Sequence, residues 1–348
     1  MKTAFFRNGA LIAAFGSALF LASCKTEETA PPPPPAPPPP AMALSSGVVQ
    51  AAASYRNYVR EASSIPATFP DAASIQTGLT RGAAYEPNEL ARGAVAYAAV
   101  LALQDPAFVQ GVKSLGADAN NRATVIRQLF SDPAYAAQLP GASSAAGTII
   151  SNLSADGRQL YAAGSAVKQT AYDIQRQMWS REYVANRDAR LATAKRISTL
   201  PMSGTTADTS MLMQAAMSGQ GLALTGQTAT PPYTEAVVRG MAIAALAVLG
   251  AAGDENAVQI NALLVDSAGP YCLRISKLNL YQCLAVAKPH YEDVFCLGQH
   301  ILMDAGECVT KISGAAKLPA WSRTMIATAP DAAAASRNAA ATAPRSRK

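Results

Sequence analysis

Histidine and charged side chains are scarce in this chain, and that scarcity limits the chemistry it can carry. Only two of its 348 residues are histidine, and charged residues make up 15%. His290 and His300 would lie about 15 Å apart along one helix, so they cannot easily share a metal ion or a substrate atom. Because H-E-x-x-H, G-x-S-x-G and Walker sequences are also absent, we assign no catalytic residue, metal or cofactor.

Two partial matches to enzyme motifs lack the residues that would complete them. Residues 165–168 have the S-x-x-K pattern of penicillin-interacting enzymes, but no K-[ST]-G sequence follows. Residues 211–214 resemble a stretch of lytic transglycosylases, yet the Glu-Ser pair that carries the acid of those enzymes is missing. Neither match therefore predicts an enzyme.

The positive charge of the chain is unevenly placed. The net charge is +6, of which residues 314–348 carry +5, whereas residues 45–313 hold 20 basic and 20 acidic residues. The body therefore has no excess charge that would predict nucleic-acid binding. Because residues 314–348 are also rich in Ala, Ser, Thr and Pro, we expect a disordered tail. This tail either contacts anionic lipopolysaccharide or cell-wall polymer, or is only solvated.

The start of the chain has the layout of a secretion signal. Lys2 and Arg7 precede an apolar run over residues 10–21. This run is shorter than the roughly 20 apolar residues of a membrane-spanning helix. Residues 21–24 read LASC, which resembles the cleavage site of bacterial lipoproteins.

That resemblance implies that residues 1–23 are removed and that Cys24 becomes the lipidated N-terminus of the mature protein. Several acyl chains on one residue would give durable membrane anchoring. Lys25 stands where an inner-membrane retention signal has Asp, so we expect an outer-membrane anchor with the body facing the periplasm. The alternative is an ordinary secretion signal with a chance cysteine.

Residues 24–44 form a proline-rich tether that favours neither helix nor sheet. Pro31–Pro35 and Pro37–Pro40 lack amide donors and favour polyproline II. At about 3.1 Å per residue, this run would hold the body roughly 30 Å from the lipid. We interpret the run as a spacer, the alternative being a ligand for a proline-binding groove.

Helical spacing of apolar residues dominates the body, and alternating β-branched runs are few. This pattern predicts an all-α, multi-helix bundle with an N-terminal helical domain (45–200) and a C-terminal helical domain (201–313). One stripe in the first helix illustrates the spacing, and it consists of Val48, Ala52, Tyr55, Val59 and Ala62.

Two copies of an Asp-Pro-Ala-aromatic motif, beginning at Asp105 and Asp132, each predict the start of a helix. Asp can accept a hydrogen bond from a free amide of the first turn, and Pro at the first helical position loses no bond. We expect the two aromatic residues, Phe108 and Tyr135, to occupy equivalent slots.

The longest helical pattern runs from Ser154 to about Ser198 and contains no proline. Apolar residues repeat every seven positions there, with mostly small residues four positions after them. The repeat predicts a coiled-coil seam against which a neighbouring helix of this chain or of a partner lies close. The seam residues are Leu153, Gly157, Leu160, Gly164, Val167, Ala171, Ile174 and Met178.

Four cysteines lie between residues 272 and 308, and Cys24 is the only other one. An even number of cysteines in a secreted protein predicts two disulfides. Two helices hinged at residues 288–289 would bring an inner and an outer pair level with each other. The nested pairing that follows is Cys283 with Cys296, and Cys272 with Cys308.

The hairpin that these disulfides would staple also carries both histidines. Metal binding is the rival interpretation, because Cys296 and His300 lie one helical turn apart, but no C-x-x-C pair is present. If the disulfides form, His290, Glu292 and His300 lie on a rigid element. We take these three residues as the candidate surface.

We therefore predict a lipid-anchored binding or scaffolding protein of the bacterial cell envelope. Its expected partners are the membrane, through the lipid, and an envelope protein or cell-wall polymer. The rival hypothesis is an envelope enzyme that acts on cell wall or peptide. The sequence does not indicate an oligomeric state.

Replacing Cys24 with Ala should leave the chain unprocessed or release it from the membrane, because the thiol would carry the anchoring lipid. Mass spectrometry of the wild-type membrane fraction should find a mature chain that begins at acylated Cys24. An unmodified N-terminus at another residue would contradict the anchor.

Overall fold

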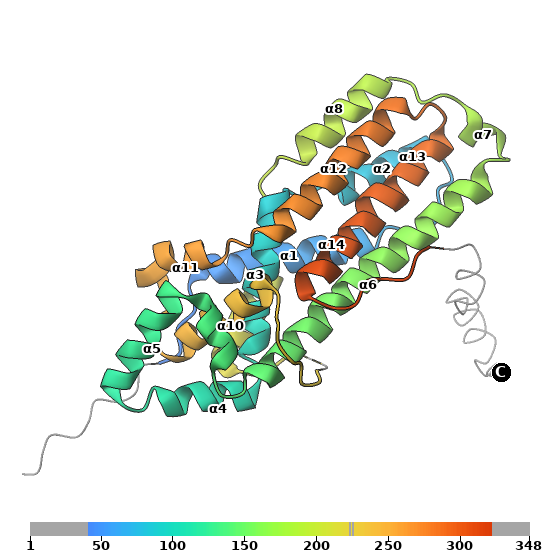
Figure 1. Cartoon of the computed structure of the whole chain (residues 1–348). Helices are drawn as coiled ribbons and strands as arrows, with labels where there is room; N and C mark the ends of the chain where they lie inside the picture. Colours follow the sequence, from blue (N-terminus) through green and yellow to red (C-terminus); the bar gives the residue numbers. More distant parts are fainter. Residues whose placement is uncertain (1–40, 223, 225, 322–348) are drawn as a thin grey trace, which may run out of the picture. The chain divides into compact units, whose positions relative to one another are not determined.

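The computed structural model describes residues 41–222, 224 and 226–321, which fold into helices joined by turns (Figure 1). No strand occurs among these residues, which confirms the predicted all-α class. The signal, most of the tether and residues 322–348 lie outside the described residues.

The α-helices are α1 (Ser46–Ser63), α2 (Ala72–Gly82), α3 (Pro87–Ala102), α4 (Pro106–Leu115), α5 (Ala119–Ser131), α6 (Ala142–Ile174), α7 (Met178–Arg181), α8 (Arg187–Ile197), α9 (Thr206–Ser218), α10 (Glu235–Val248), α11 (Ala257–Leu263), α12 (Ala268–Val286), α13 (His290–Cys296) and α14 (Asp304–Ser313). Two short 3-10 helices cover Pro133–Gln138 and Asp254–Asn256. A π-helical stretch, Leu297–Met303, joins α13 to α14.

Within the described ranges, no single helix is long and apolar enough to cross a membrane. By length and composition alone, the pair of α3 and α4 together could cross a membrane, but the chain bends by 82° between these two helices.

The first helix buries the stripe that its sequence predicts. The Ser45 side chain accepts a hydrogen bond from Val48 N and starts α1. All five stripe residues are buried. α1 packs along α3, which Glu86 caps and in which nearly every residue is buried. Burial on all sides makes α3 a central helix of the bundle.

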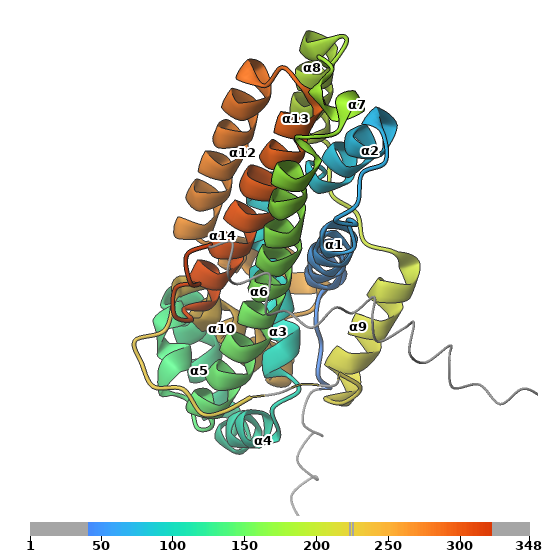
Figure 2. The ribbon, with the colours of Figure 1, turned by 90° about the vertical axis from the view of Figure 1, so that its right-hand side faces the viewer.

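One hydrophobic core contains residues of both predicted domains, from Leu44 to Ile312. α10, from the second predicted domain, packs on α3, and α14 packs on α6 (Figure 2). The boundary predicted between residues 200 and 201 therefore passes between segments that share one core.

The two Asp-Pro motifs start different kinds of helix. Asp105 accepts a hydrogen bond from Phe108 N and starts α4, and Phe108 is buried. Asp132 accepts from Ala134 N but starts only a 3-10 helix, in which Tyr135 is half-buried. The expectation of equivalent slots is therefore wrong, because the second copy has no following α-helix to direct its ring inward.

The helix predicted over residues 154–198 begins earlier and is broken twice, so its predicted bounds are wrong. α6 ends at Ile174, and α7 and α8 follow as separate helices. Ser180 donates hydrogen bonds to Ile174 O and Gln177 O and closes the turn after α6. α8 then contacts both α2 and α12. Side-chain bonds to backbone carbonyls thus close the first of the two breaks, in a sequence that contains no proline.

The predicted seam of α6 is buried against the C-terminal helices. A Cβ on Gly306 would lie 2.6 Å from Gly157 O, and a Cβ on Gly164 would lie 2.6 Å from Met303 N. A Cβ on Gly298 would meet the α6 backbone at 2.6 Å. Glycines on both sides therefore bring the helix backbones into contact, which only the absence of side chains allows.

Both predicted disulfides are confirmed. Cys272 is bonded to Cys308 and Cys283 to Cys296, with Cα–Cα distances of 5.6 and 5.7 Å. They join α12 to the run formed by α13, the π-helical stretch and α14 (Figure 1). We call this unit, residues 268–313, the stapled hairpin, and its turn at residues 287–289 the hinge.

The first part of the predicted tail packs on the body, which corrects the prediction for residues 314–321. Tyr161 Oη donates a 2.8 Å hydrogen bond to Pro319 O. The Trp321 ring stacks on Tyr172 at 5.7 Å between centroids, and Lys168 Nζ lies 4.3 Å from the centre of the Trp321 ring. An indole ring gains from aromatic and cationic neighbours, and composition alone does not reveal those neighbours.

Replacing Gly306 with Ala should destabilise the fold by about 1–3 kcal/mol, because the new methyl group presses on the α6 backbone. Gly47→Ala is the matched control, since nothing lies within 4 Å of a Cβ there. That change should be neutral or stabilise by up to about 1 kcal/mol. Urea unfolding followed by circular dichroism measures both free energies, and equal values would contradict backbone contact at the seam.

Candidate functional site

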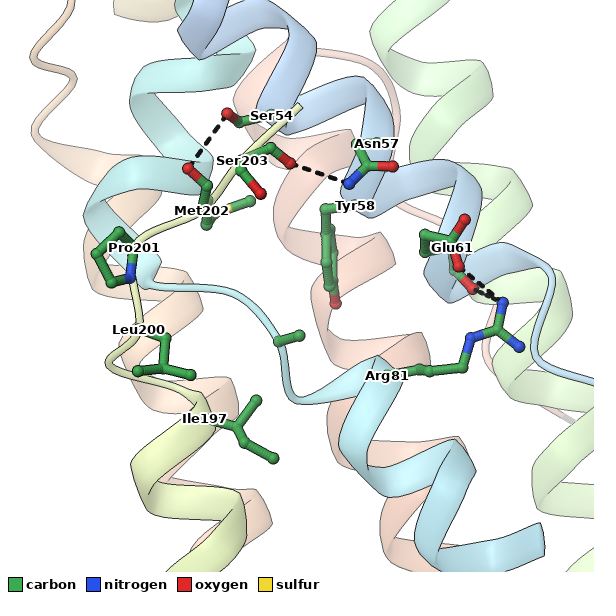
Figure 3. Close-up of a pocket in the computed structure, with 11 residues that line it drawn as sticks. Ser54, Asn57, Tyr58, Glu61, Arg81, Ile197, Leu200, Pro201, Met202 and Ser203 are labelled. Carbon is green, nitrogen blue, oxygen red and sulfur yellow. Dashed lines mark hydrogen bonds and ion pairs between the residues drawn. The ribbon is translucent and has the colours of Figure 1, made fainter. Parts of the chain in front are cut away.

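A cavity of about 210 Å³ opens between α1, the end of α2 and residues 197–203 (Figure 3). Tyr58 forms part of its wall. Its polar groups form hydrogen bonds with one another. Asn57 Nδ2 donates to Ser203 O, Ser54 Oγ donates to Met202 O, and Arg81 donates to Glu61. These bonds tie residues 202–203 to α1 and α2 to α1, so we interpret the cavity as a packing gap at this junction.

A buried lysine lies behind this cavity. Lys277 Nζ donates to Ala83 O and Ser198 Oγ, at 2.7 and 2.9 Å, and lies 3.5 Å from the centre of the Tyr85 ring. Burial lowers the pKa of Lys277 well below its ordinary value. Tyr85 in turn packs against Tyr58. The amine therefore joins α12 to the ends of α2 and α8.

The structure separates the three residues of the predicted candidate surface. His300 Nδ1 lies 2.9 Å from Asp304 Oδ2, one turn along the same run of helix. His290 packs against Trp179, and its pKa is lowered by burial. Glu292 accepts a hydrogen bond from the backbone of Lys288 at the hinge. His290 and Glu292 therefore lie just after the hinge, whereas His300 lies further along the run beside Asp304.

Residues 182–186, which we call the strap, lie along the hinge. Val184 N donates to Lys288 O at 2.8 Å, and His290 N donates to Glu182 O at 3.2 Å. Just beyond the strap, Arg187 donates to the carbonyls of Ala285 and Ala287 at the end of α12. The strap, α7 and residues 286–292 form one end of the bundle, which we call the hinge end (Figure 1).

Exposed apolar side chains gather at the hinge end. Met178 is 86% exposed, Val286 73% and Tyr183 71%. These are three of the four most exposed large hydrophobic residues in the described part of the chain, the fourth being Val258 on α11 at 83%. Met178 is also the last residue of the coiled-coil seam predicted from the sequence, so it was expected to lie against a neighbouring helix. Exposed apolar residues that cluster mark interaction surfaces more often than residues scattered singly.

A cavity of about 280 Å³ lies beside the strap at this end. Arg181 and Lys288 contribute its positive charges and Glu292 its only carboxylate. Tyr183 and Val286 supply apolar lining. The hinge end thus combines exposed apolar groups with two basic and two acidic side chains, since the exposed Glu182 of the strap adds to Glu292.

A buried ion pair fixes the hinge from inside. Arg190 forms a hydrogen-bonded salt bridge with Asp293, and both side chains are 3% exposed. Arg190 also donates to Leu284 O and Ala287 O at the end of α12. Burial raises the pKa of Asp293 to about 6, and the bond to Arg190 opposes that rise. This pair was not predicted, since nothing in the sequence relates two charges 103 positions apart.

The S-x-x-K residues have separate partners. Ser165 Oγ donates to Tyr161 O, and Lys168 Nζ donates to Gln299 Oε1. All four cysteines of the body form disulfides. Across the described residues, no group of three or more His, Cys, Asp or Glu side chains could hold a metal ion.

Comparison with known proteins gives no relative. No protein-family model matches the chain, and neither the curated proteins nor the solved structures contain a similar one. The function must therefore be inferred from the residues of this chain.

Replacing Asp293 with Ala should cost about 3–5 kcal/mol of stability, because it leaves the Arg190 charge buried without its partner. The double variant R190M/D293L should lose much less than the sum of the two single changes. It removes both charges and keeps most of the buried volume. A double-mutant cycle in urea measures this coupling, and single losses that simply add would contradict it.

Proposed function

We propose that the chain is a lipid-anchored binding or scaffolding protein of the bacterial cell envelope, with the hinge end as its binding face. The observation that carries this proposal is that three strongly exposed apolar side chains lie at this end: Met178 on α7, Tyr183 on the strap and Val286 at the end of α12 in the stapled hairpin.

Two features support the envelope location. Residues 1–24 have the layout of a lipoprotein signal ending at Cys24. The four cysteines of the body are paired as disulfides, which form and persist in oxidising compartments such as the periplasm. Lipidation at Cys24 would then anchor a body whose disulfides are stable in that compartment.

The direction of the tether supports the choice of face. The described chain begins beside the end of α10, where Ala43 N donates to Ala247 O and Leu44 pairs with Ala252. The hinge end lies at the other end of the helical body in both views (Figures 1 and 2). A body tethered through residue 41 therefore leaves the hinge end free for a partner.

The side chains of this face favour a protein partner. The cores of protein interfaces are enriched in Tyr, Met and Arg and depleted in acidic residues. Tyr183 and Arg181 line one cavity at the hinge end, and Met178 begins α7, the helix that ends at Arg181. We therefore expect an envelope protein that presents an apolar patch.

The triple variant M178S/Y183S/V286S should lose its partner while keeping its fold, because all three side chains are exposed. The matched control is V258S, which changes an equally exposed apolar residue on α11. Native lipidated protein is purified with its cross-linked partners, and the proteins recovered with each variant are compared by quantitative mass spectrometry.

The expected result is a protein recovered with the wild type and with V258S but reduced at least tenfold with the triple variant. Equal recovery with all three chains would rule out the hinge end as the binding face.

A further inference from the structure

A cavity of about 300 Å³ lies at the end of α12 opposite the hinge. The starts of α10 and α12 and the end of α14 form its wall, and Cys272 and Cys308 both line it. Ala268 and Lys311 belong to the same lining and are exposed, so the cavity opens to solvent. The outer of the two disulfides therefore borders a space that a reagent can enter.

The two disulfides differ in this access. Cys272 and Cys283 are both half-buried, and their partners Cys308 and Cys296 are both buried. The cavity beside the strap at the hinge end, however, is lined by neither Cys283 nor Cys296. Disulfides that a thiol can reach exchange readily, whereas enclosed ones serve as structural bonds. We therefore expect the outer disulfide to be the more reactive one.

The charges around the cavity favour release of a thiolate. Lys311 lies one helical turn after Cys308 on α14 and is the only cation of the lining. Glu235 and Asp266 also line the cavity, but Glu235 is paired with Arg239, and Asp266 accepts two backbone amide bonds at the start of α12. A neighbouring ammonium group stabilises a thiolate, so Lys311 would help Cys308 to leave.

We propose that the disulfide between Cys272 and Cys308 is a thiol–disulfide exchange site that is reduced by a dithiol. A thiolate of the dithiol attacks Cys272 Sγ, the sulfur of the less buried cysteine, and forms a mixed disulfide. The bond between the two cysteines breaks at the same time, and Cys308 leaves as a thiolate beside Lys311.

The second thiol of the dithiol completes the exchange. It loses its proton and attacks the mixed disulfide, which closes a disulfide within the dithiol and releases Cys272 as a thiolate. The dithiol thus loses two electrons and two protons, and both cysteines of the protein end as thiols.

Reduction at this site leaves the hinge end in place. The bond between Cys283 and Cys296 and the glycine contacts between α6 and the C-terminal run do not involve the outer disulfide. The inference goes beyond the proposed function, because the cavity and the exposed apolar cluster lie at opposite ends of α12.

Timed reduction of the full-length protein in detergent with dithiothreitol, under native conditions, tests the proposal. Samples are alkylated with N-ethylmaleimide at intervals, and mass spectrometry of the digested chain measures the alkylated fraction of each cysteine. Cys272 and Cys308 should react at least tenfold faster than Cys283 and Cys296. Their rate should be proportional to the dithiothreitol concentration, because attack through the cavity requires no unfolding.

Two variants test the path to the disulfide. Ala268→Phe places a large ring in the lining and should slow reduction of the outer bond at least fivefold. Ala262→Phe, at an exposed alanine of α11 outside the lining, is the matched control and should leave the rate unchanged. Equal thermal midpoints of the two variants, measured by circular dichroism, ensure that the comparison concerns access and not folding.

A second pair of variants and a monothiol test the direction of the exchange. Lys311→Gln should slow reduction at least threefold, whereas Lys317→Gln, at an exposed lysine outside the lining, should not. Glutathione should form its mixed disulfide at Cys272. A glutathione adduct at Cys308, or an unchanged rate with Lys311→Gln, would contradict Cys308 as the leaving group.

Three results would overturn the exchange site itself. These are equal rates for the two disulfides, faster reduction of the inner one, and a rate that does not depend on the dithiothreitol concentration. The last result would mean that opening of the fold, and not the cavity, gives access to the bond.

Discussion

Backbone contact between α6 and the C-terminal helical run is the constraint on which the rest of the structure depends. Gly157 and Gly164 on one side meet Gly306 and Gly298 on the other. No side chain fits between these backbones, so α14 and the π-helical stretch are fixed along α6. The disulfides then hold α12 against the same run. As a result, the end of α6 and the hinge lie at the same end of the bundle.

The hinge end is held in place by this packing and by further bonds of its own. The strap is bonded to the hinge through backbone groups, and the buried pair of Arg190 and Asp293 connects α8 to both arms of the hairpin. Apolar side chains exposed on such an element are held ready for a partner at low entropic cost.

Local patterns made much of the fold predictable. The stripe on α1, the Asp cap of α4 and the seven-residue repeat of α6 are short-range features, and the structure confirms each of them. The nested disulfides were also predictable, because cysteine positions relative to Pro289 follow helix geometry. Gly298 and Gly306 were missed, although they supply the other half of the seam, because glycine gives no periodic signal of its own.

The site was harder to predict than the fold. His290, Glu292 and His300 all lie on the stapled hairpin, but only the first two lie next to its hinge, and His300 bonds to Asp304 further along it. The strap, the exposure of Tyr183 and the pairing of Arg190 with Asp293 all depend on the chain turning back after Ile174. That turn is made by Ser180 through bonds to backbone carbonyls, and serine occurs in too many contexts to predict it. The docking of Trp321 likewise depends on residues more than 140 positions earlier.

The central claim is that the hinge end is the surface that a partner occupies in the cell. Site-specific photo-crosslinking tests it most directly, with a benzoylphenylalanine in place of Tyr183 and, in a second strain, in place of Val258. The account predicts a discrete crosslinked species from position 183 and none from position 258. Crosslinks from position 258 alone, or from neither position, would contradict it.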